Sequence, residues 1–186
     1  MTQSPPRPEP DPPPRRRRPE AAFLVRFLGL LLLLFLVVAS RPVNDAVVEP
    51  FTGLVARAGG AACRLLGEPV TTSGTLIASP RFAVNIRNGC NGVETMLIFA
   101  AGVLAFPAPW TARLLGLLAG SLLIQAVNVV RIASLFFIGA RWPAAFEDWH
   151  VVVWQAIVVL FGVVLWIFWA HRFALRPRPS RQAIPG

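Results

Sequence analysis

Residues 21–40, AAFLVRFLGLLLLLFLVVAS, form an apolar run that only Arg26 interrupts. A helix of this length reaches about 30 Å, which is the thickness of the hydrocarbon core of a bilayer. Arg15 to Arg18 directly precede the run, as in a signal peptide, but its length and the lack of a small-x-small cleavage site favour retention. We therefore expect a first membrane span that ends at Arg41-Pro42.

The composition of the whole chain supports a membrane protein. Of its 186 residues, 55% are hydrophobic and 15% are charged, whereas soluble domains have a charged share of about 25%. The formal net charge is +9, and every basic residue is an arginine. Because arginines gather beside the apolar runs at the two ends, we interpret the charge as topology and contact with the lipid bilayer, not as nucleic-acid binding.

Three further apolar segments cover residues 93–110, 112–131 and 151–170, and the second of these remains apolar or small as far as Ala140 apart from Arg131. The fold class we expect is an all-α integral membrane protein with about four transmembrane helices and a small extracytoplasmic segment. Arginines before the first span and after the last place both termini in the cytosol, as an even number of spans requires.

The chain divides into one membrane domain and two tails. Residues 1–20 are rich in proline and charge, which predicts a disordered cytosolic tail. Residues 21–170 form the polytopic domain, and residues 171–186 a basic cytosolic tail. Between the first two spans we expect an amphipathic helix over 51–66 and a β-hairpin that joins the stretches 70–77 and 81–86.

This topology gathers Cys90, Arg131 and His150 at the outer membrane face from three separate places in the sequence. A thiol becomes a nucleophile as thiolate, which a nearby cation or a helix N-terminus favours. Histidine can hold the thiolate as an ion pair and later protonate the leaving amine, while arginine can donate hydrogen bonds to a developing oxyanion. The three residues together predict acyl transfer through a thioester.

Each of these residues also has a structural interpretation. Cys90 could be a small buried residue or form a disulfide with Cys63; Arg131 could reach the lipid headgroups, and His150 could belong to a belt of interfacial tryptophans. The turn sequence Asn88-Gly-Cys-Asn-Gly favours a presented nucleophile, because glycine and asparagine suit tight turns with exposed backbone amides.

Other polar residues are candidates for supporting roles: Asn91 in the turn, Asn128 three residues before Arg131, and Glu94 four residues after Cys90. Asn128 could hold the guanidinium or a substrate carbonyl, and Glu94 could orient His150 or Arg131 or only favour a helix N-terminus. Glu147 and Asp148 could orient His150. No metal-binding His-x-x-x-His spacing or phosphate-binding glycine loop occurs, so we predict no metal or cofactor.

The blocks Asn88-Gly-Cys-Asn-Gly-Val-Glu94, Asn128-Val-Val-Arg131 and Trp149-His150 resemble, in this order, the signature of the exosortase/archaeosortase family. The compact chain is most similar to the exosortase H subgroup, which is associated with IPTL-CTERM substrates. The resemblance implies a multi-pass protein of the bacterial inner membrane with its active site on the periplasmic face. It also implies Cys90 as nucleophile, Arg131 as ligand of substrate or transition state, and His150 as acid and base.

The implied partners are exported proteins whose C-terminal sorting signal combines a short motif, a hydrophobic helix and an arginine cluster. The enzyme would be a cysteine-dependent peptidase or transpeptidase that releases this signal. Two alternatives stay open at this point: a non-enzymatic assembly or scaffold protein in which Cys90 is structural, and a small transporter that uses Arg131 within the bundle. The acceptor of the transfer step and the oligomeric state are left open by the sequence.

Overall fold

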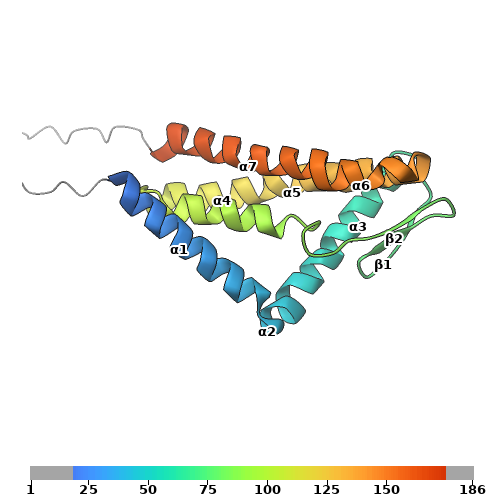
Figure 1. Ribbon diagram of the computed structural model, residues 1–186, viewed down its shortest axis with the longest axis horizontal. Coiled ribbons are helices and arrows are strands. Elements are labelled where there is room, and N and C mark those ends of the chain that lie inside the picture. The colour runs from blue at the N-terminus through green and yellow to red at the C-terminus, as the bar shows by residue number, and fades with distance from the viewer. Residues whose placement is uncertain (1–18, 175–186) are drawn as a thin grey trace, which may run out of the picture.

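The computed structural model describes residues 19–174. Two predictions therefore lie wholly or mostly outside the described residues: the disordered tail over residues 1–18 and the basic tail over residues 175–186. The described chain is mostly helical with one small sheet. Three apolar helices run roughly along the long axis of the molecule, α4 (Val93–Ala105), α5 (Trp110–Arg141) and α7 (Gln155–Trp169), and a fourth, α1 (Pro19–Ala39), runs obliquely to them. Helix α3 (Glu49–Leu65) and the sheet lie towards the other end from the termini (Figure 1).

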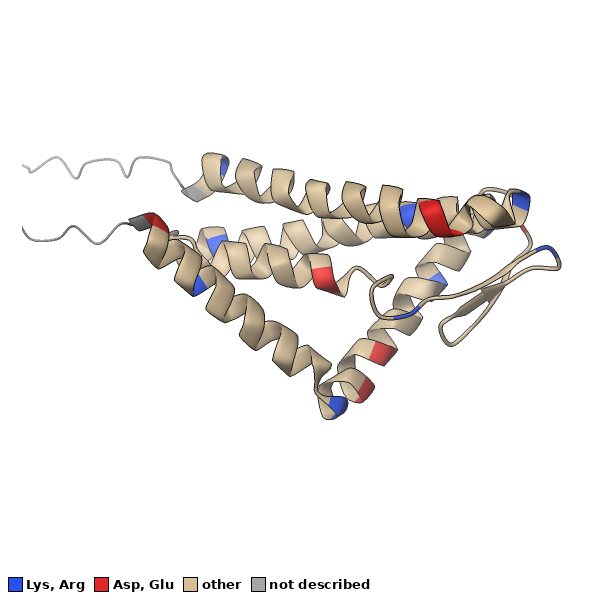
Figure 2. Cartoon of the chain, viewed as in Figure 1, with Lys and Arg blue, Asp and Glu red and all other residues tan. Residues whose placement is uncertain are grey.

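Within residues 19–174, three helical stretches are long and apolar enough to cross a membrane: Glu20–Ala39, Trp110–Arg141 and Pro143–Phe173. Charged side chains are sparse along these helices, and most of their length is tan in Figure 2. The surface of α1 agrees with a lipid environment, because side chains such as Leu32 (61% exposed) and Leu36 (61%) lack a protein neighbour that covers them. The predicted membrane character is therefore supported, whereas a count of four spans is not established.

Helix α4 corrects the second predicted span. It ends at Ala105, not near residue 110, because Pro107 and Pro109 lack the backbone N–H groups that a helix needs. Its 13 residues rise only about 20 Å. The prediction of a helix in this region was right, but its length was overestimated.

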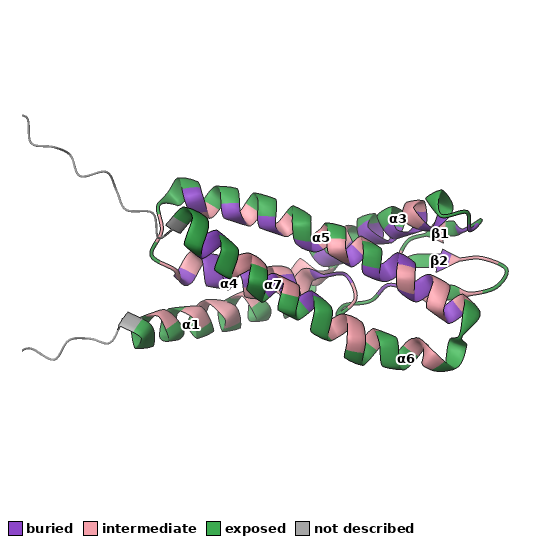
Figure 3. Cartoon of the chain, turned by 90° about the horizontal axis from the view of Figure 1, so that it is seen from above, coloured by how far each residue is buried: buried purple, intermediate pink, exposed green. Residues whose placement is uncertain are grey.

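Helix α5 corrects the third predicted span, which we placed over residues 112–131. The helix has 32 residues and continues ten residues past Arg131, which therefore lies inside it. The additional turns are apolar because they contact protein: Ile132, Ala133 and Phe136 pack in one hydrophobic cluster with α3 and the sheet. A second cluster around Phe99 and Ile124 joins α4, α5 and α7, and Figure 3 shows the buried faces of these helices.

The sheet is small and antiparallel, with strand order β1 (Thr71–Ser73), β2 (Leu76–Ala78) and β3 (Ala83–Asn85). The predicted hairpin between 70–77 and 81–86 is present as β2 and β3. The stretch 70–77 is not one strand, however, because Gly74 at φ +57° turns the chain back and makes β1 and β2 a second hairpin. The predicted amphipathic helix over 51–66 is present as α3, which starts two residues earlier.

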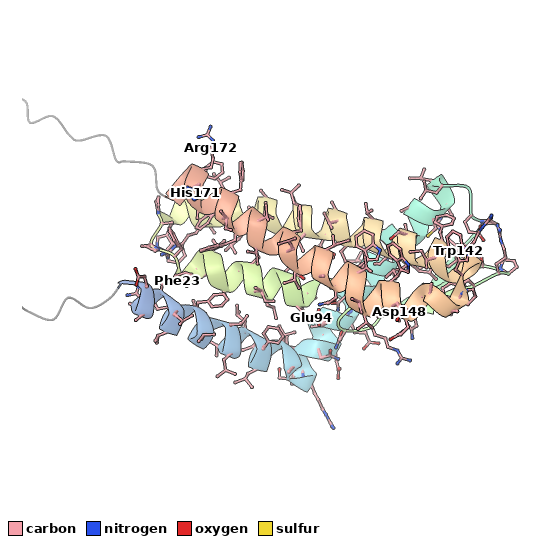
Figure 4. All side chains as sticks on the ribbon, turned by 45° about the horizontal axis from the view of Figure 1, so that its top comes forward. Phe23, Glu94, Trp142, Asp148, His171 and Arg172 are labelled. Atoms are coloured by element: carbon pink, nitrogen blue, oxygen red, sulfur yellow. The ribbon has the colours of Figure 1, made fainter. Side chains whose placement is uncertain are left out.

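The last helical stretch corrects the fourth predicted span, over 151–170. After a break at Trp142 the chain continues through a 3₁₀ turn (Pro143–Ala145), the short α6 (Phe146–Asp148), and a π-helical segment (Trp149–Trp154) into α7. A further π-helical turn, Ala170–Ala174, follows α7. His150 thus lies within a continuous helical run and not in a loop before it. Trp142 and the pair His171 and Arg172 lie at opposite ends of the molecule (Figure 4).

Candidate active site

The Cys90 turn joins β3 to α4. Gly89 and Gly92 adopt φ values of +89° and +78°, which few residues other than glycine tolerate, and they let the chain reverse on both sides of the cysteine. The backbone N–H of Cys90 donates to the carbonyl of Arg87 over 2.9 Å. The thiol is half-buried at the start of α4.

The thiol of Cys90 contacts the imidazole of His150, with 2.7 Å between Sγ and Nε2. The Nη2 of Arg131 donates to the backbone carbonyl of His150 over 3.5 Å. The three side chains come from the turn before α4, from the middle of α5 and from the π-helical segment before α7. The structure thus brings together the three residues that the sequence analysis singled out.

Arg131 is buried, with 3% of its surface exposed. The one ion pair within residues 19–174 joins Arg81 to Glu68, so no described carboxylate is in direct contact with Arg131, and the charge of Glu94 acts on it only from a greater distance. Its Nε has no hydrogen-bond partner among the described residues. A buried cation without a carboxylate in contact is costly, and such a group is suited to an oxyanion or another polar group of a ligand.

Arg131, Cys90 and His150 line a cavity of about 170 Å³. Its other walls come from the end of β3 and the segment after it, from α5 beyond Arg131 and from α6: Val84, Asn85, Ile86, Arg87, Ile132, Leu135, Phe146 and Glu147. Cys90 packs against the hydrophobic cluster that α5 forms with α3 and the sheet, and Ile86 and Ile132 of this cluster line the cavity. A ligand in this cavity would touch all three candidate residues.

The environment of Cys90 favours the neutral thiol at rest. Burial raises the pKa of the thiol above its ordinary value of 9.0, and this effect exceeds the opposing influence of the Arg131 cation and of the hydrogen bond to the backbone of Arg87. A thiol in contact with Nε2 of histidine can pass its proton to the ring as it attacks. The site therefore favours general-base activation over a preformed thiolate, which is a change from the sequence-based expectation.

A model of the transmembrane exosortase family matches residues 19–170 of this chain, which include all three side chains of the cavity. The chain belongs to the exosortase family. Exosortases are in general cysteine-dependent transpeptidases of membranes that act on exported proteins with C-terminal sorting signals. No curated protein and no solved structure gave a match to this chain.

In this exosortase, a polar network that is largely buried holds the Cys90 turn from two sides. The side chain of Asn91 is fully buried, and its Nδ2 donates to Oγ1 of Thr52 on α3 over 2.9 Å. Its backbone carbonyl accepts a hydrogen bond of 3.1 Å from Nε2 of Gln125 on α5. Gln125 also accepts from Asn128 over 3.5 Å. Sequence reasoning missed Thr52 and Gln125, because neither their spacing nor their residue type marks them.

The predicted supporting residues have other contacts than those we considered. Asn128 is buried against Gln125 and is not hydrogen-bonded to Arg131. Glu94 accepts a hydrogen bond of 2.8 Å from the backbone N–H of Gly89, and so fastens the turn to the first turn of α4. Figure 4 labels Glu94 at this end of α4. Neither Glu147 nor Asp148 is hydrogen-bonded to His150, whose Nδ1 has no partner among the described residues.

Both cysteines of the chain are free thiols. Cys63 is fully buried in the hydrophobic cluster that α5 forms with α3 and the sheet, and burial followed by the charge of the nearby Glu68 raises the pKa of its thiol. The Cys63–Cys90 disulfide, which would have favoured a scaffold protein, is therefore not formed. Cys90 remains available to react, and Cys63 provides a matched control for it.

Proposed function

We propose that this exosortase is a membrane-embedded cysteine peptidase or transpeptidase that cleaves the C-terminal sorting signals of exported proteins on the extracytoplasmic side. The observation that carries the proposal is the contact of 2.7 Å between the thiol of Cys90 and Nε2 of His150, beside the buried Arg131, in a chain of this family. The substrates are proteins that end in a short motif, an apolar helix and an arginine cluster.

The first half of the reaction forms a thioester. Nε2 of His150 takes the proton of Cys90 while Sγ attacks the carbonyl carbon of the scissile peptide. The guanidinium of Arg131 donates hydrogen bonds to the oxyanion of the tetrahedral intermediate. Protonated His150 then gives its proton to the departing amine, so that the C–N bond breaks and the C-terminal helix leaves with a new amino group.

The second half resolves the thioester. An acceptor amine, or water in the hydrolytic variant, loses a proton to His150 as it attacks the same carbonyl carbon. The C–S bond then breaks, and Cys90 recovers its proton from His150. Arg131 stabilises the second oxyanion as it did the first. No cofactor is needed for this sequence, because atoms and protons balance between the peptide, the acceptor and the two side chains.

The long α5 suggests where the site lies in the bilayer. Arg131 lies about 30 Å along the helix from Trp110, and this distance equals the thickness of a hydrocarbon core. With Trp110 at the cytosolic boundary, the site is at the outer boundary, and α3 with the sheet is outside. In this arrangement both termini are cytosolic. Residues 21–170 form one membrane domain, in which α4 is the fourth apolar helix. The membrane that we propose is the bacterial inner membrane.

Processing of a co-expressed reporter tests the proposal. The reporter is an exported protein followed by a variable segment of six residues, an apolar helix and an arginine cluster, and its cleavage is measured at matched membrane abundance of each exosortase variant. We expect loss of cleavage in Cys90→Ala and retention in Cys63→Ala. Cleavage that survives in Cys90→Ala would show that the cysteine mechanism is wrong and would leave the scaffold alternative in first place.

A further inference from the structure

Strand β3 has one edge that no strand covers. It pairs with β2 on one side and is the last strand in the order β1-β2-β3. Ala83, Asn85 and Arg87 of the segment are all exposed. An open edge presents backbone N–H and C=O groups that can pair with another extended chain, which proteins usually prevent by covering it or by adding charge.

The register shows which backbone groups face this edge. The N–H of Ile86 donates to the carbonyl of Thr75, and the N–H of Ser79 donates to the carbonyl of Phe82. Because hydrogen-bonded and non-hydrogen-bonded pairs alternate in antiparallel sheets, the even-numbered residues of β3 point their backbone groups towards β2. Those of Ala83 and Asn85 therefore point the other way, towards the open edge.

The open edge leads directly to the nucleophile. The segment from Val84 to Arg87 lines the same cavity as Cys90, and four residues separate the end of β3 from Cys90. Leu135 of α5 and Phe146 of α6 line the cavity as well. A chain that lay along the open edge of β3 would thus enter this cavity and reach the Cys90 thiol.

We propose that the edge of β3 binds the substrate as an added β-strand. The bound segment is the extended peptide of the exported protein just before the scissile bond, and this inference rests on the proposed peptidase function. Strand addition supplies main-chain hydrogen bonds that do not depend on side chains, and alternate side chains of the peptide give specificity. It also holds the scissile carbonyl at a fixed distance from Cys90, which is the positioning that peptide cleavage requires.

The direction of the added strand follows from the direction of the chain. After β3 the polypeptide turns at Cys90 and enters α4, which runs towards the end of the molecule where α1 begins. A substrate whose apolar helix follows its scissile bond has to run the same way, so it lies parallel to β3. One alternate side chain of the peptide then faces Ile132, Leu135 and Phe146, which favours an apolar residue there.

The first arm of the test removes one edge donor from the enzyme. Ala83→Pro deletes an N–H that faces the open edge, at the first position of an edge strand, where proline is tolerated. Ala83→Val keeps the N–H and is the matched control. With the purified full-length protein and the cleavable reporter, we expect Ala83→Pro to raise KM about five- to tenfold with kcat within about twofold, and Ala83→Val to raise KM clearly less than Ala83→Pro. The rate of iodoacetamide alkylation of Cys90 should be equal in all three proteins.

The second arm leaves the enzyme unchanged and moves a proline through the six residues that precede the cleavage site of the reporter. Strand addition predicts loss of cleavage at every second position, because alternate N–H groups of the substrate pair with β3. Equal tolerance at all positions, together with a normal KM in Ala83→Pro, overturns the inference while the peptidase function stands. A change of oligomeric state in Ala83→Pro without a change in KM would also overturn the inference. It would assign the open edge of β3 to contacts between copies of this protein. A wild-type protein that cleaves no reporter overturns the proposed function and this inference with it.

Discussion

The resting state of Cys90 depends on two opposing influences, of which burial is the stronger. Arg131 is the nearest cation that lowers the pKa of the thiol, so Arg131→Gln should raise this pKa further and reduce the thiolate fraction at any given pH. We expect the alkylation rate of Cys90 at pH 8 to fall severalfold in Arg131→Gln, with the whole pH profile shifted upwards. Mass spectrometry of iodoacetamide adducts in a Cys63→Ala background measures this alkylation rate at each pH.

Arg131→Lys is the matched control, because it keeps the charge and loses the planar set of donors. We expect its alkylation profile to stay close to wild type, while reporter cleavage falls. An alkylation profile that is identical in wild type and Arg131→Gln would show that the guanidinium does not act on the thiol.

The sequence identified Cys90, Arg131 and His150 because their residue types carry chemistry and their order matches a family signature. It could not identify Thr52 or Gln125, which hold the turn through hydrogen bonds to Asn91. Threonine and glutamine are common in helices without any such role, and only the packing of α3 and α5 against the turn gives them one. The apolar or small residues 132–140 indicated that Arg131 lies away from the end of its helix, but they did not show that this part of α5 contacts α3 and the sheet.

The π-helical segment Trp149–Trp154 sets the direction of His150 relative to α7. Such segments widen the helical turn by one residue and often occur at functional sites. Deletion of Val152, which is 65% exposed, should restore α-helical spacing and rotate the preceding residues by about 100°. We expect reporter cleavage to fall about 100-fold, whereas Val152→Ala should leave it unchanged. Normal cleavage in the deletion variant would show that this segment does not position His150.

Close contact between α4 and α5 depends on Gly120. A Cβ at this position would meet the ring of Phe99 on α4, whereas a Cβ at Gly29 on α1 would meet nothing. Gly120→Ala should therefore destabilise the protein by about 1–3 kcal/mol through overpacking. Gly29→Ala should be neutral or slightly stabilising, because alanine favours the helix.

Thermal unfolding of the two glycine variants in the same detergent measures this difference. Equal unfolding temperatures would mean that α4 and α5 can separate at little cost.

The helices illustrate which features of the fold were predictable. Helix α1 was predicted from a long apolar run and helix α3 from an amphipathic pattern, and both helices are present. Each of these patterns is typical of only one kind of helix. Helix α5 does not, since residues 132–140 are apolar for contact with α3 and the sheet, and hydropathy does not distinguish a lipid neighbour from a protein neighbour. The early end of α4 was indicated by Pro107 and Pro109, which we took for the turn after a longer helix.

At the scale of the whole molecule, the orientation in the membrane is open to a direct test. In a protein without Cys63 and Cys90, a membrane-impermeant maleimide should label Ser73→Cys in intact cells, because β1 lies on the outer side in the proposed topology. Arg172→Cys, at the opposite end of the molecule, should be labelled only after permeabilisation. Labelling in the reverse order would invert the topology and place the site on the cytosolic face.

The shortness of α4 has a consequence for the depth of the nucleophile. A helix of 13 residues is about 10 Å too short for an average hydrocarbon core. None of its residues is exposed, because α1, α5 and α7 surround it. Asn91 and Gly92, which precede it, are buried as well. Irregular backbone at membrane depth is tolerated where protein encloses it, so the turn that carries Cys90 can begin below the outer end of the longer helices.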